Sequence, residues 1–316
     1  MTFTVHLCTG GLAHMLRLIG TTISYCELLG RNLIVYSETH HGFQLPFYSI
    51  FNPTNKCLVP IDEYSSTVNL YEENPCHEAP PRLEEVKLRF VGSVELGNRY
   101  VISHEGHTYE YNLELNEQQQ YSDLFELTSG QRWPNPPTEG QLGVRTLPIA
   151  GGHPTSLRSI SIKSHIVSKA MERISRIGNP FVGIHFRNTD MKHEISDIIS
   201  STREAIVETG IGDIFLATDD SSSVKIFQLE FPGIKIHSFS HIPDHKALGQ
   251  NSIHYMSIPA LTKAGLSKKT QIEDALCDIV GLTYSDVFIP SESSAMSQLV
   301  TYLRSEEELR NIFIGH

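Results

Sequence analysis

The chain has 316 residues, of which 40% are hydrophobic and 19% are charged, and its formal net charge is −11. These values are typical of a soluble globular protein with enough residues for two domains. The negative charge argues against broad binding to nucleic acids or anionic membranes, because both need a basic surface, although a few arginines can still form a local anion pocket.

The sequence predicts neither a secretion signal nor a membrane-spanning helix. The N-terminus begins with the strand-like segment Thr2–Val5, without a basic flank and a long apolar core. No apolar run is long enough to cross a membrane as a helix. Five cysteines lie far apart without a CxxC motif, which favours reduced thiols and a cytoplasmic location.

The first predicted unit is a strand, a glycine turn, a helix and a second strand. Residues 3–8 are predicted as a strand, Gly10 and Gly11 make the turn, and apolar spacing predicts a helix over 12–30 before a strand at 33–36. Backbone N–H groups at such a turn can bind an anion. The turn reads CTGGLAH rather than GxGxxG and no acidic residue ends the second strand, so a nicotinamide-dependent oxidoreductase is a poor fit.

The middle of the chain is predicted to carry a small β region and then a linker. Residues 131–154 are rich in Pro and Gly and form the candidate linker, so the predicted domains are 1–152 and 153–316. The β region is predicted from three short alternating runs, 86–90, 99–102 and 108–111.

The second half alternates predicted helices and strands, which indicates an α/β fold with a parallel sheet. Strands are predicted at about 181–186, 213–217, 234–237 and 286–290, and helices at 155–177, up to 208, at 222–230, at 270–282, from 295, and at the C-terminus behind a Ser305–Glu308 capping box. The carboxyl ends of such strands meet at one edge, where ligands bind in open α/β sheets.

Polar clusters follow three of these strands: HFRNTD (185–190), ATDD (217–220) and PSESS (290–294). They are expected to converge on one crevice, where the guanidinium of Arg187 offers a fixed fork of donors to a phosphate. Closely spaced histidines at 104–107 and 237–245 are interpreted as turn and loop residues, and no metal site is predicted.

These motifs resemble those of the GDP-fucose-dependent fucosyltransferases, a superfamily that includes the nodulation α-1,6-fucosyltransferase and the protein O-fucosyltransferases. GIHFRNTD (183–190) matches the family's GVHxRRTD, and IFLATDD (214–220) matches its xxLATDD. Asp278 through PSESSAMS (290–297) matches a third pattern, and GGLAHMLRLIG (10–20) resembles the opening GGLGNRLR. The resemblance covers both ends of the chain in the right order, whereas the middle, about 40–150, carries none of it.

The resemblance implies a GT-B-like α/β fold of two facing Rossmann-like domains with parallel sheets and a small inserted β region. Domain 1–152 would lie on the acceptor side and domain 153–316 would bind the GDP-sugar. The implied reaction moves a sugar, fucose in this family, from GDP to a glycan hydroxyl, with inversion and without a metal or other cofactor. The implied partners are therefore a GDP-sugar donor and a glycan acceptor.

The resemblance also assigns roles to residues of this sequence. Arg187 would grip the diphosphate and stabilise the charge on departing GDP, and Asp278 would accept hydrogen bonds from the guanine N1–H and 2-amino group. Glu194 and His14 are the candidates for the general base. The other residues implied in GDP-sugar binding are Gly10, Gly11, Arg17, His185, Asp190, Asp219, Asp220, Ser291, Ser293 and Ser294.

Two departures from the family pattern leave alternatives open. Asn188 replaces the second arginine of the RR pair, and His14 replaces the N-terminal asparagine. Arg17 either supplies charge from the first domain or is an ordinary surface arginine, and Asp219 and Asp220 either lie near the nucleotide or cap the following helix. A nucleotide-sugar-binding protein without turnover is therefore the second hypothesis.

Overall fold

A computed structural model describes residues 3–7, 11–13, 15, 16, 19, 20, 23, 32–37, 43–54, 57, 58, 86–94, 97–104, 107–114, 143–145, 154–188, 195–243, 256, 258–291 and 294–315. Contacts divide the chain into two compact units, one of residues 1–10, 15–40 and 44–161 and the other of residues 11–14, 41–43 and 162–316. The functional division between residues 152 and 153 stays a prediction.

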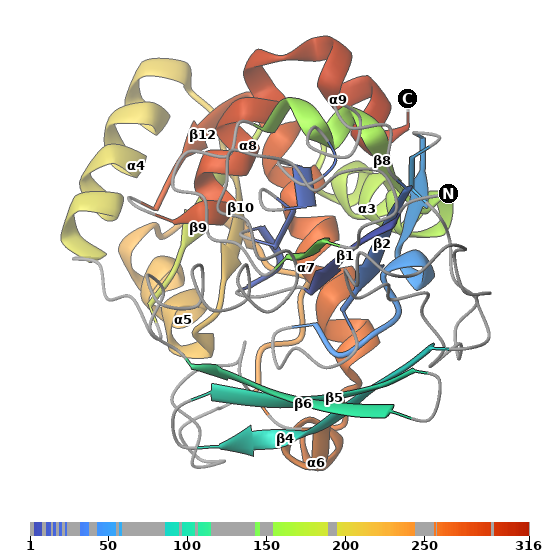
Figure 1. Cartoon of the computed structure of the whole chain (residues 1–316). Coiled ribbons are helices and arrows are strands. Elements are labelled where there is room, and N and C mark those ends of the chain that lie inside the picture. The colour runs from blue at the N-terminus through green and yellow to red at the C-terminus, as the bar shows by residue number, and fades with distance from the viewer. Residues whose placement is uncertain are drawn as a thin grey trace. The chain divides into compact units, whose positions relative to one another are not determined.

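The first unit contains a three-stranded parallel sheet in the order β2 (Asn32–Tyr36), β1 (Phe3–Leu7) and β7 (Gly143–Arg145) (Figure 1). Strands β1 and β2 lie where the sequence predicted them. Between them, Leu16, Ile19 and Ile23 are helical and fully buried, as the apolar spacing predicted. Strand β7 falls inside the predicted linker, because three residues are too few to produce a detectable alternation.

The predicted β region is a three-stranded antiparallel sheet of β4 (Val86–Val94), β5 (Gly97–His104) and β6 (His107–Glu114). Its strands are longer than the alternating runs that predicted them. A β-bulge shifts the register between Phe90 and Gly92, which interrupts the period of two in the sequence. The inserted β region is therefore confirmed, with different strand ends.

The predicted helix over 155–177 is too long at its start. Residues Pro154–Ser159 form the 3-10 helix η3, and Ile160–Ile162 form strand β8, which pairs with β3 (Phe51–Pro53). Ile160 and Ile162 are buried on either side of the half-buried Ser161, a period of two that fits a strand. The α-helix proper is α3 (Ser164–Ile177).

The second unit is built on a four-stranded parallel sheet, which confirms the predicted α/β architecture. The sheet order is β11 (Lys235–His237), β10 (Asp213–Thr218), β9 (Val182–Phe186) and β12 (Val287–Ile289). Helices α4 (Ile195–Thr209) and α5 (Ser221–Glu230) cover one face, α7 (Lys268–Thr283) covers the other, and α3 packs against α7 (Figure 1). Helix α8 (Ala295–Ser305) packs against α7 and leads into α9 (Glu307–Ile314).

Side chains along β9 point alternately to the two faces of the sheet, and the two faces are packed differently. Val182, Ile184 and Phe186 are buried in the core cluster that α4 and α5 complete. Gly183 faces the opposite layer, where a Cβ in its place would lie 2.6 Å from the Ser285 hydroxyl oxygen. The strand therefore needs glycine there, because the segment leading into β12 passes too close for any side chain.

The predicted capping box of the terminal helix is wrong. Helix α8 extends to Ser305, whose hydroxyl donates backward to the carbonyl of Tyr302 at 3.0 Å. Residue Glu306 is the N-cap of α9, without a side-chain hydrogen bond. The two helices follow each other so closely that Ser305 closes the first and cannot open the second.

Two further observations concern helices within the described ranges. Helix α6 (Ile258–Lys263) was not predicted, because six residues show little periodicity; its Pro259 lies in the first turn, where proline is accepted. None of the helices in these ranges combines the length and the apolar character that crossing a bilayer requires.

Candidate functional site

The three polar clusters predicted from the sequence meet at the carboxyl edge of the second sheet. The Arg187 amide, just after β9, lies 3.4 Å from the Ser291 hydroxyl, which follows β12. The Asn188 amide donates to the Asp219 carboxylate, which follows β10, at 2.8 Å. The backbone that carries Arg187 is therefore held from both neighbouring strands.

The imidazole of His185 braces this edge from within. It is 6% exposed, and its Nδ1 lies 2.7 Å from the Ser297 hydroxyl at the start of α8. The same hydroxyl accepts the Ser291 amide at 2.9 Å. One serine thus ties β9, the β12 loop and α8 together. A contact of His185 with the nucleotide stays a prediction.

Asp220 performs the capping role that the sequence left open. Its Oδ1 accepts the Ser222 amide at 3.1 Å, as the N-cap of α5. Its Oδ2 accepts the hydroxyls of Ser222 and Ser223, at 2.8 and 3.3 Å, and the Asn188 side-chain amide at 2.9 Å. Asn188, at the position of the second family arginine, is therefore a structural brace. Nucleotide contacts of Asp219 and Asp220 stay predictions.

The loop after β12 presents the N-terminus of α8. Ser294 is the N-cap residue, but its side chain makes no capping hydrogen bond. Its hydroxyl oxygen is buried and has no hydrogen-bond partner among the described residues. Buried hydroxyls normally have a partner, and a phosphate oxygen at a helix N-terminus would supply one.

Asp278 lies on α7, apart from this cluster. Its Oδ2 accepts the Ser240 hydroxyl at 2.7 Å, and its Oδ1 lies 3.8 Å from Arg173 Nη1 without a hydrogen bond. Burial raises the pKa of Asp278 to about 7, against the opposing effects of the Ser240 hydrogen bond and the Arg173 charge.

Sheet geometry relates Asp278 to the cluster. Ser240 follows β11 by three residues, so it lies at the carboxyl edge of the same sheet. Strands β11 and β9 are separated by β10, a distance of roughly 10 Å at the usual strand spacing. A ligand that reaches from Arg187 to Asp278 must therefore extend along this edge, as a nucleoside diphosphate does.

Several predicted site residues lie outside the described residues: Gly10, His14, Arg17, Asp190, Glu194 and Ser293. Gly11 is described, is partly exposed, and has no atom within 4 Å of the position that a Cβ would take. No described neighbour therefore explains why glycine stands there, and its role in anion binding stays a prediction.

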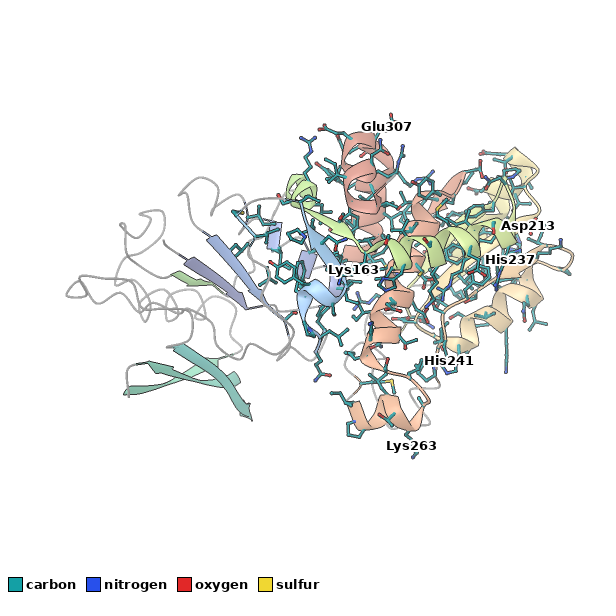
Figure 2. The ribbon with its side chains drawn as sticks, turned by 90° about the vertical axis from the view of Figure 1, so that its right-hand side faces the viewer. Lys163, Asp213, His237, His241, Lys263 and Glu307 are labelled. Carbon is teal, nitrogen blue, oxygen red and sulfur yellow. The ribbon has the colours of Figure 1, made fainter. Side chains whose placement is uncertain are left out.

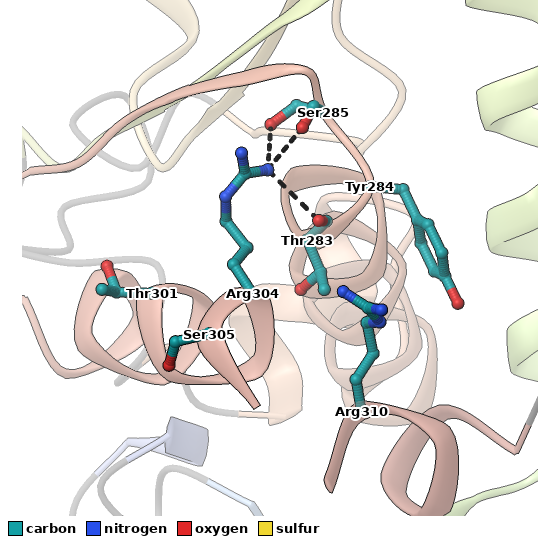
Figure 3. Close-up of a pocket in the computed structure, with 7 residues that line it drawn as sticks. All are labelled: Thr283, Tyr284, Ser285, Thr301, Arg304, Ser305 and Arg310. Carbon is teal, nitrogen blue, oxygen red and sulfur yellow. Dashed lines mark hydrogen bonds between the residues drawn. The ribbon is translucent and has the colours of Figure 1, made fainter. Parts of the chain in front are cut away.

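A cavity of about 520 Å³ lies at the opposite, amino edge of the sheet (Figure 3). Arg304 within it donates to the carbonyls of Leu282, Thr283 and Ser285 at the end of α7. This guanidinium donates to carbonyls that the end of the helix leaves without intrahelical partners, so the role of Arg304 is structural. Burial and the nearby Arg310 lower the pKa of Arg304, while the charge of Asp286 opposes that effect.

No sequence motif pointed to Arg173 or Ser240. Arg173 lies four residues after Lys169 on α3, and Asp278 lies four after Asp274 on α7, so complementary charges face each other across the two helices. That spacing is a usable signal only when α3 and α7 are known to pack together. Within the described ranges, no group of three His, Cys, Asp or Glu residues is arranged to hold a metal ion.

No protein-family model matches the chain, and no curated protein matches its sequence. Solved structures do match. The NodZ α-1,6-fucosyltransferase co-crystallised with GDP has a TM-score of 0.55 at 14% identity, over 95% of this chain and 91% of that one. Fucosyltransferase NodZ from Bradyrhizobium gives 0.53 at 14% identity over the same shares. POFUT1 in complex with GDP-fucose gives 0.53 at 14% identity, over 98% and 94%.

The chain has the fold of these fucosyltransferases. The predicted GT-B-like fold class is thereby confirmed. The match extends over nearly the whole chain, including the middle region in which the sequence showed no family motif.

Proposed function

We propose that the chain is a glycosyltransferase that moves a sugar, fucose, from GDP to a hydroxyl of a glycan. The acceptor oxygen attacks the anomeric carbon on the face opposite to GDP. The new C–O bond forms as the bond to the β-phosphate oxygen breaks, with inversion, and the electron pair leaves on GDP. The acceptor proton passes to a general base, for which Glu194 and His14 remain the candidates.

The observation that carries this proposal is the meeting of three motifs at one sheet edge. The three strand ends are joined there by two hydrogen bonds: the Arg187 amide donates to the Ser291 hydroxyl, and the next amide, of Asn188, donates to the Asp219 carboxylate. A guanidinium held on rigid backbone stabilises the charge of a departing diphosphate without reorganisation and without a metal. The buried hydroxyl of Ser294, which has no hydrogen-bond partner within the described part of the chain, supports a phosphate oxygen in the same loop.

The fold supports the donor class. The similar NodZ and POFUT1 structures hold GDP or GDP-fucose. In this chain Asp278 would read the base, because a carboxylate accepts from the two adjacent donors of guanine and leaves uracil or adenine unmatched. The middle of the chain, where the sequence departs most from the family, would determine which acceptor glycan is recognised.

Replacing Arg187 tests the proposal. In Arg187→Ala, transfer from GDP-fucose should fall by about 10²-fold or more, because no other group can neutralise the leaving diphosphate from that position. Transfer to a panel of glycan acceptors is measured with radiolabelled GDP-fucose, and every reaction contains EDTA because the proposed chemistry uses no metal. Circular dichroism checks that the variant is folded.

Arg176→Ala is the matched control, since this arginine ends α3 and makes only an exposed ion pair with Glu172 among the described contacts. It should transfer at the wild-type rate. Equal rates for Arg187→Ala and wild type would contradict the role of Arg187. Tight GDP-fucose binding by the wild type with no transfer to any acceptor would favour the binding protein without turnover.

A further inference from the structure

Guanine and adenine present different groups at the position where Asp278 is proposed to read the base. Guanine offers two donors, N1–H and the 2-amino group, and two donors need two acceptor oxygens. Adenine in the same pose offers N1, which is an acceptor, and a C–H group. An ionised carboxylate accepts only, whereas a protonated one also donates through its O–H group. The protonation state of Asp278 therefore decides which base it fits.

Asp278 lies in a setting where neither protonation state is strongly favoured. It is 6% exposed on α7, and burial disfavours the carboxylate. The groups that face it are Arg173 and Lys169 from α3, Asp274 one turn earlier on α7, and Ser240 from the segment after β11. The cations and the hydroxyl favour ionisation, and Asp274 opposes it.

Ser240 makes the only hydrogen bond to Asp278 that is seen among the described residues. Arg173 is already committed to Asp274, with its Nη2 2.5 Å from Oδ1, so its Nη1 acts on Asp278 only as a charge at 3.8 Å. A hydroxyl that donates to Oδ2 stabilises the carboxylate and leaves Oδ1 without a partner. Removing the hydroxyl removes the one directional contact that favours ionisation.

The segment that carries Ser240 is itself held in place. His237 Nε2 lies 2.8 Å from the Asp213 carboxylate, and the two residues lie side by side on β11 and β10 (Figure 2). The ring of Phe239 stacks on His237, with centroids 6.2 Å apart, and the Arg173 guanidinium lies 5.9 Å from its centroid. The amide of His241 lies 3.5 Å from the Asp274 carboxylate. Ser240 is therefore presented to Asp278 by neighbours on both sides.

We propose that Ser240 is a specificity-determining positioning residue, which holds Asp278 as a carboxylate and thereby makes the site select guanine over adenine. This inference rests on the proposed GDP-sugar site. It adds that base selectivity depends on pH and that the Ser240 hydroxyl sets the midpoint, which a purely structural hydrogen bond would not do. Selectivity for guanine rises as Asp278 ionises, because GDP needs the ionised form and ADP needs the protonated one.

The test compares dissociation constants for GDP and ADP, measured by calorimetry from about pH 5.5 to about pH 8.5. The phosphates of the two nucleotides titrate alike, so their effect cancels in the ratio of the constants. In the wild type, the preference for GDP should rise with pH by up to tenfold per unit through the region near pH 7 where Asp278 titrates.

Ser240→Ala should move the pH midpoint of GDP binding upward by about one unit, the effect of losing one hydrogen bond to a charged group. GDP should bind about fivefold more weakly near pH 7, up to about tenfold more weakly at the acidic end, and nearly equally well at the alkaline end. Ser240→Thr keeps a hydroxyl and should restore the wild-type profile. Asp278→Asn presents one acceptor and one donor at every pH. Its preference for GDP over ADP should therefore be independent of pH and the weakest of the variants.

A GDP-to-ADP ratio that stays constant with pH in the wild type, or superimposable GDP profiles for wild type and Ser240→Ala, would overturn the inference and leave GDP binding intact. Absence of binding by either nucleotide at any pH would instead defeat the proposed function, and the inference with it. If Ser240→Ala does not fold, the GDP-to-ADP ratios of dissociation constants for the wild type and Asp278→Asn still test whether ionisation of Asp278 sets the base selectivity.

Discussion

At the scale of single residues, Asn188 shows how a departure from a family motif acquires a physical meaning. Its amide and side chain hold Asp219 and Asp220, so the position serves the geometry of the β9 loop. One guanidinium fewer remains near the proposed diphosphate site, which places more of the charge stabilisation on Arg187.

Asp278 makes a prediction about stability as well as binding. Its pKa rises from an ordinary 3.8 to about 7 in the folded chain, so between those values the folded state holds a proton that the unfolded state has released. The free energy of unfolding must therefore fall as pH rises from about 4 to about 7, and level off above that, with the group contributing at most about 4 kcal/mol. This pH dependence has the opposite sign to that of a salt-bridged aspartate.

Asp278→Asn should remove this contribution, because asparagine does not titrate. Compared with the wild type, the variant should gain stability progressively over the same pH range in urea unfolding experiments. Asp213→Asn is a useful reference, since it changes a carboxylate in the same unit that is partly exposed and paired with His237. A wild-type-minus-variant difference that is constant with pH would show that Asp278 titrates normally.

At the scale of elements, the tightest requirement is the packing of β9 against the segment before β12. A Cβ on Gly183 would lie 2.6 Å from the Ser285 hydroxyl, which is itself held by the Leu282 carbonyl and Arg304. Gly183→Ala should therefore lower the free energy of unfolding by about 1–3 kcal/mol, the usual cost of overpacking. Chemical denaturation of the wild type and the variant measures it.

Gly212→Ala is the matched control, because a Cβ there would meet no atom within 4 Å, just before β10. Its stability should be unchanged or slightly higher. If both alanine variants are as stable as the wild type, then β9 and the segment before β12 do not approach as closely as described.

Sequence patterns predicted the strongly periodic elements and missed several short ones, although the short strands β11 and β12 were predicted within the alternating series of helices and strands. The apolar runs of β9 and β10 and the helices that follow them were predicted close to their observed limits. The ends of these predicted strands also located the polar clusters. Strand β7, strand β8 and helix α6 were missed, because three to six residues carry too little periodicity. Strands β7 and β8 form only because they pair with β1 and β3, which lie far away in the sequence.

The candidate site divides in the same way. Residues that follow strands, such as Arg187, Asp219 and Ser291, could be grouped by topology alone, since parallel strands end at one edge. Arg173 and Ser240 could not, because their link to Asp278 depends on how α3, α7 and the segment after β11 pack. The roles of Asp220 and Asn188 as braces likewise needed side-chain geometry.

At the scale of the whole molecule, the chain has a net charge of −11 and is proposed to bind a dianionic diphosphate. Attraction must therefore be local, from Arg187 and the N-terminus of α8, rather than from the general field of the protein. The structural match covers 95% of the chain, whereas the family motifs are confined to its two ends.

If the carboxyl edge of the second sheet binds GDP through Arg187, GDP should stabilise the folded chain against thermal unfolding. A ligand that binds only the folded chain stabilises it by about 2.7 kcal/mol at a hundredfold excess over its dissociation constant. GDP should raise the melting temperature of the wild type by several degrees, UDP and CDP at the same concentration should not, and Arg187→Ala should lose most of the GDP effect. No shift with GDP, or an equal shift with UDP, would contradict the account.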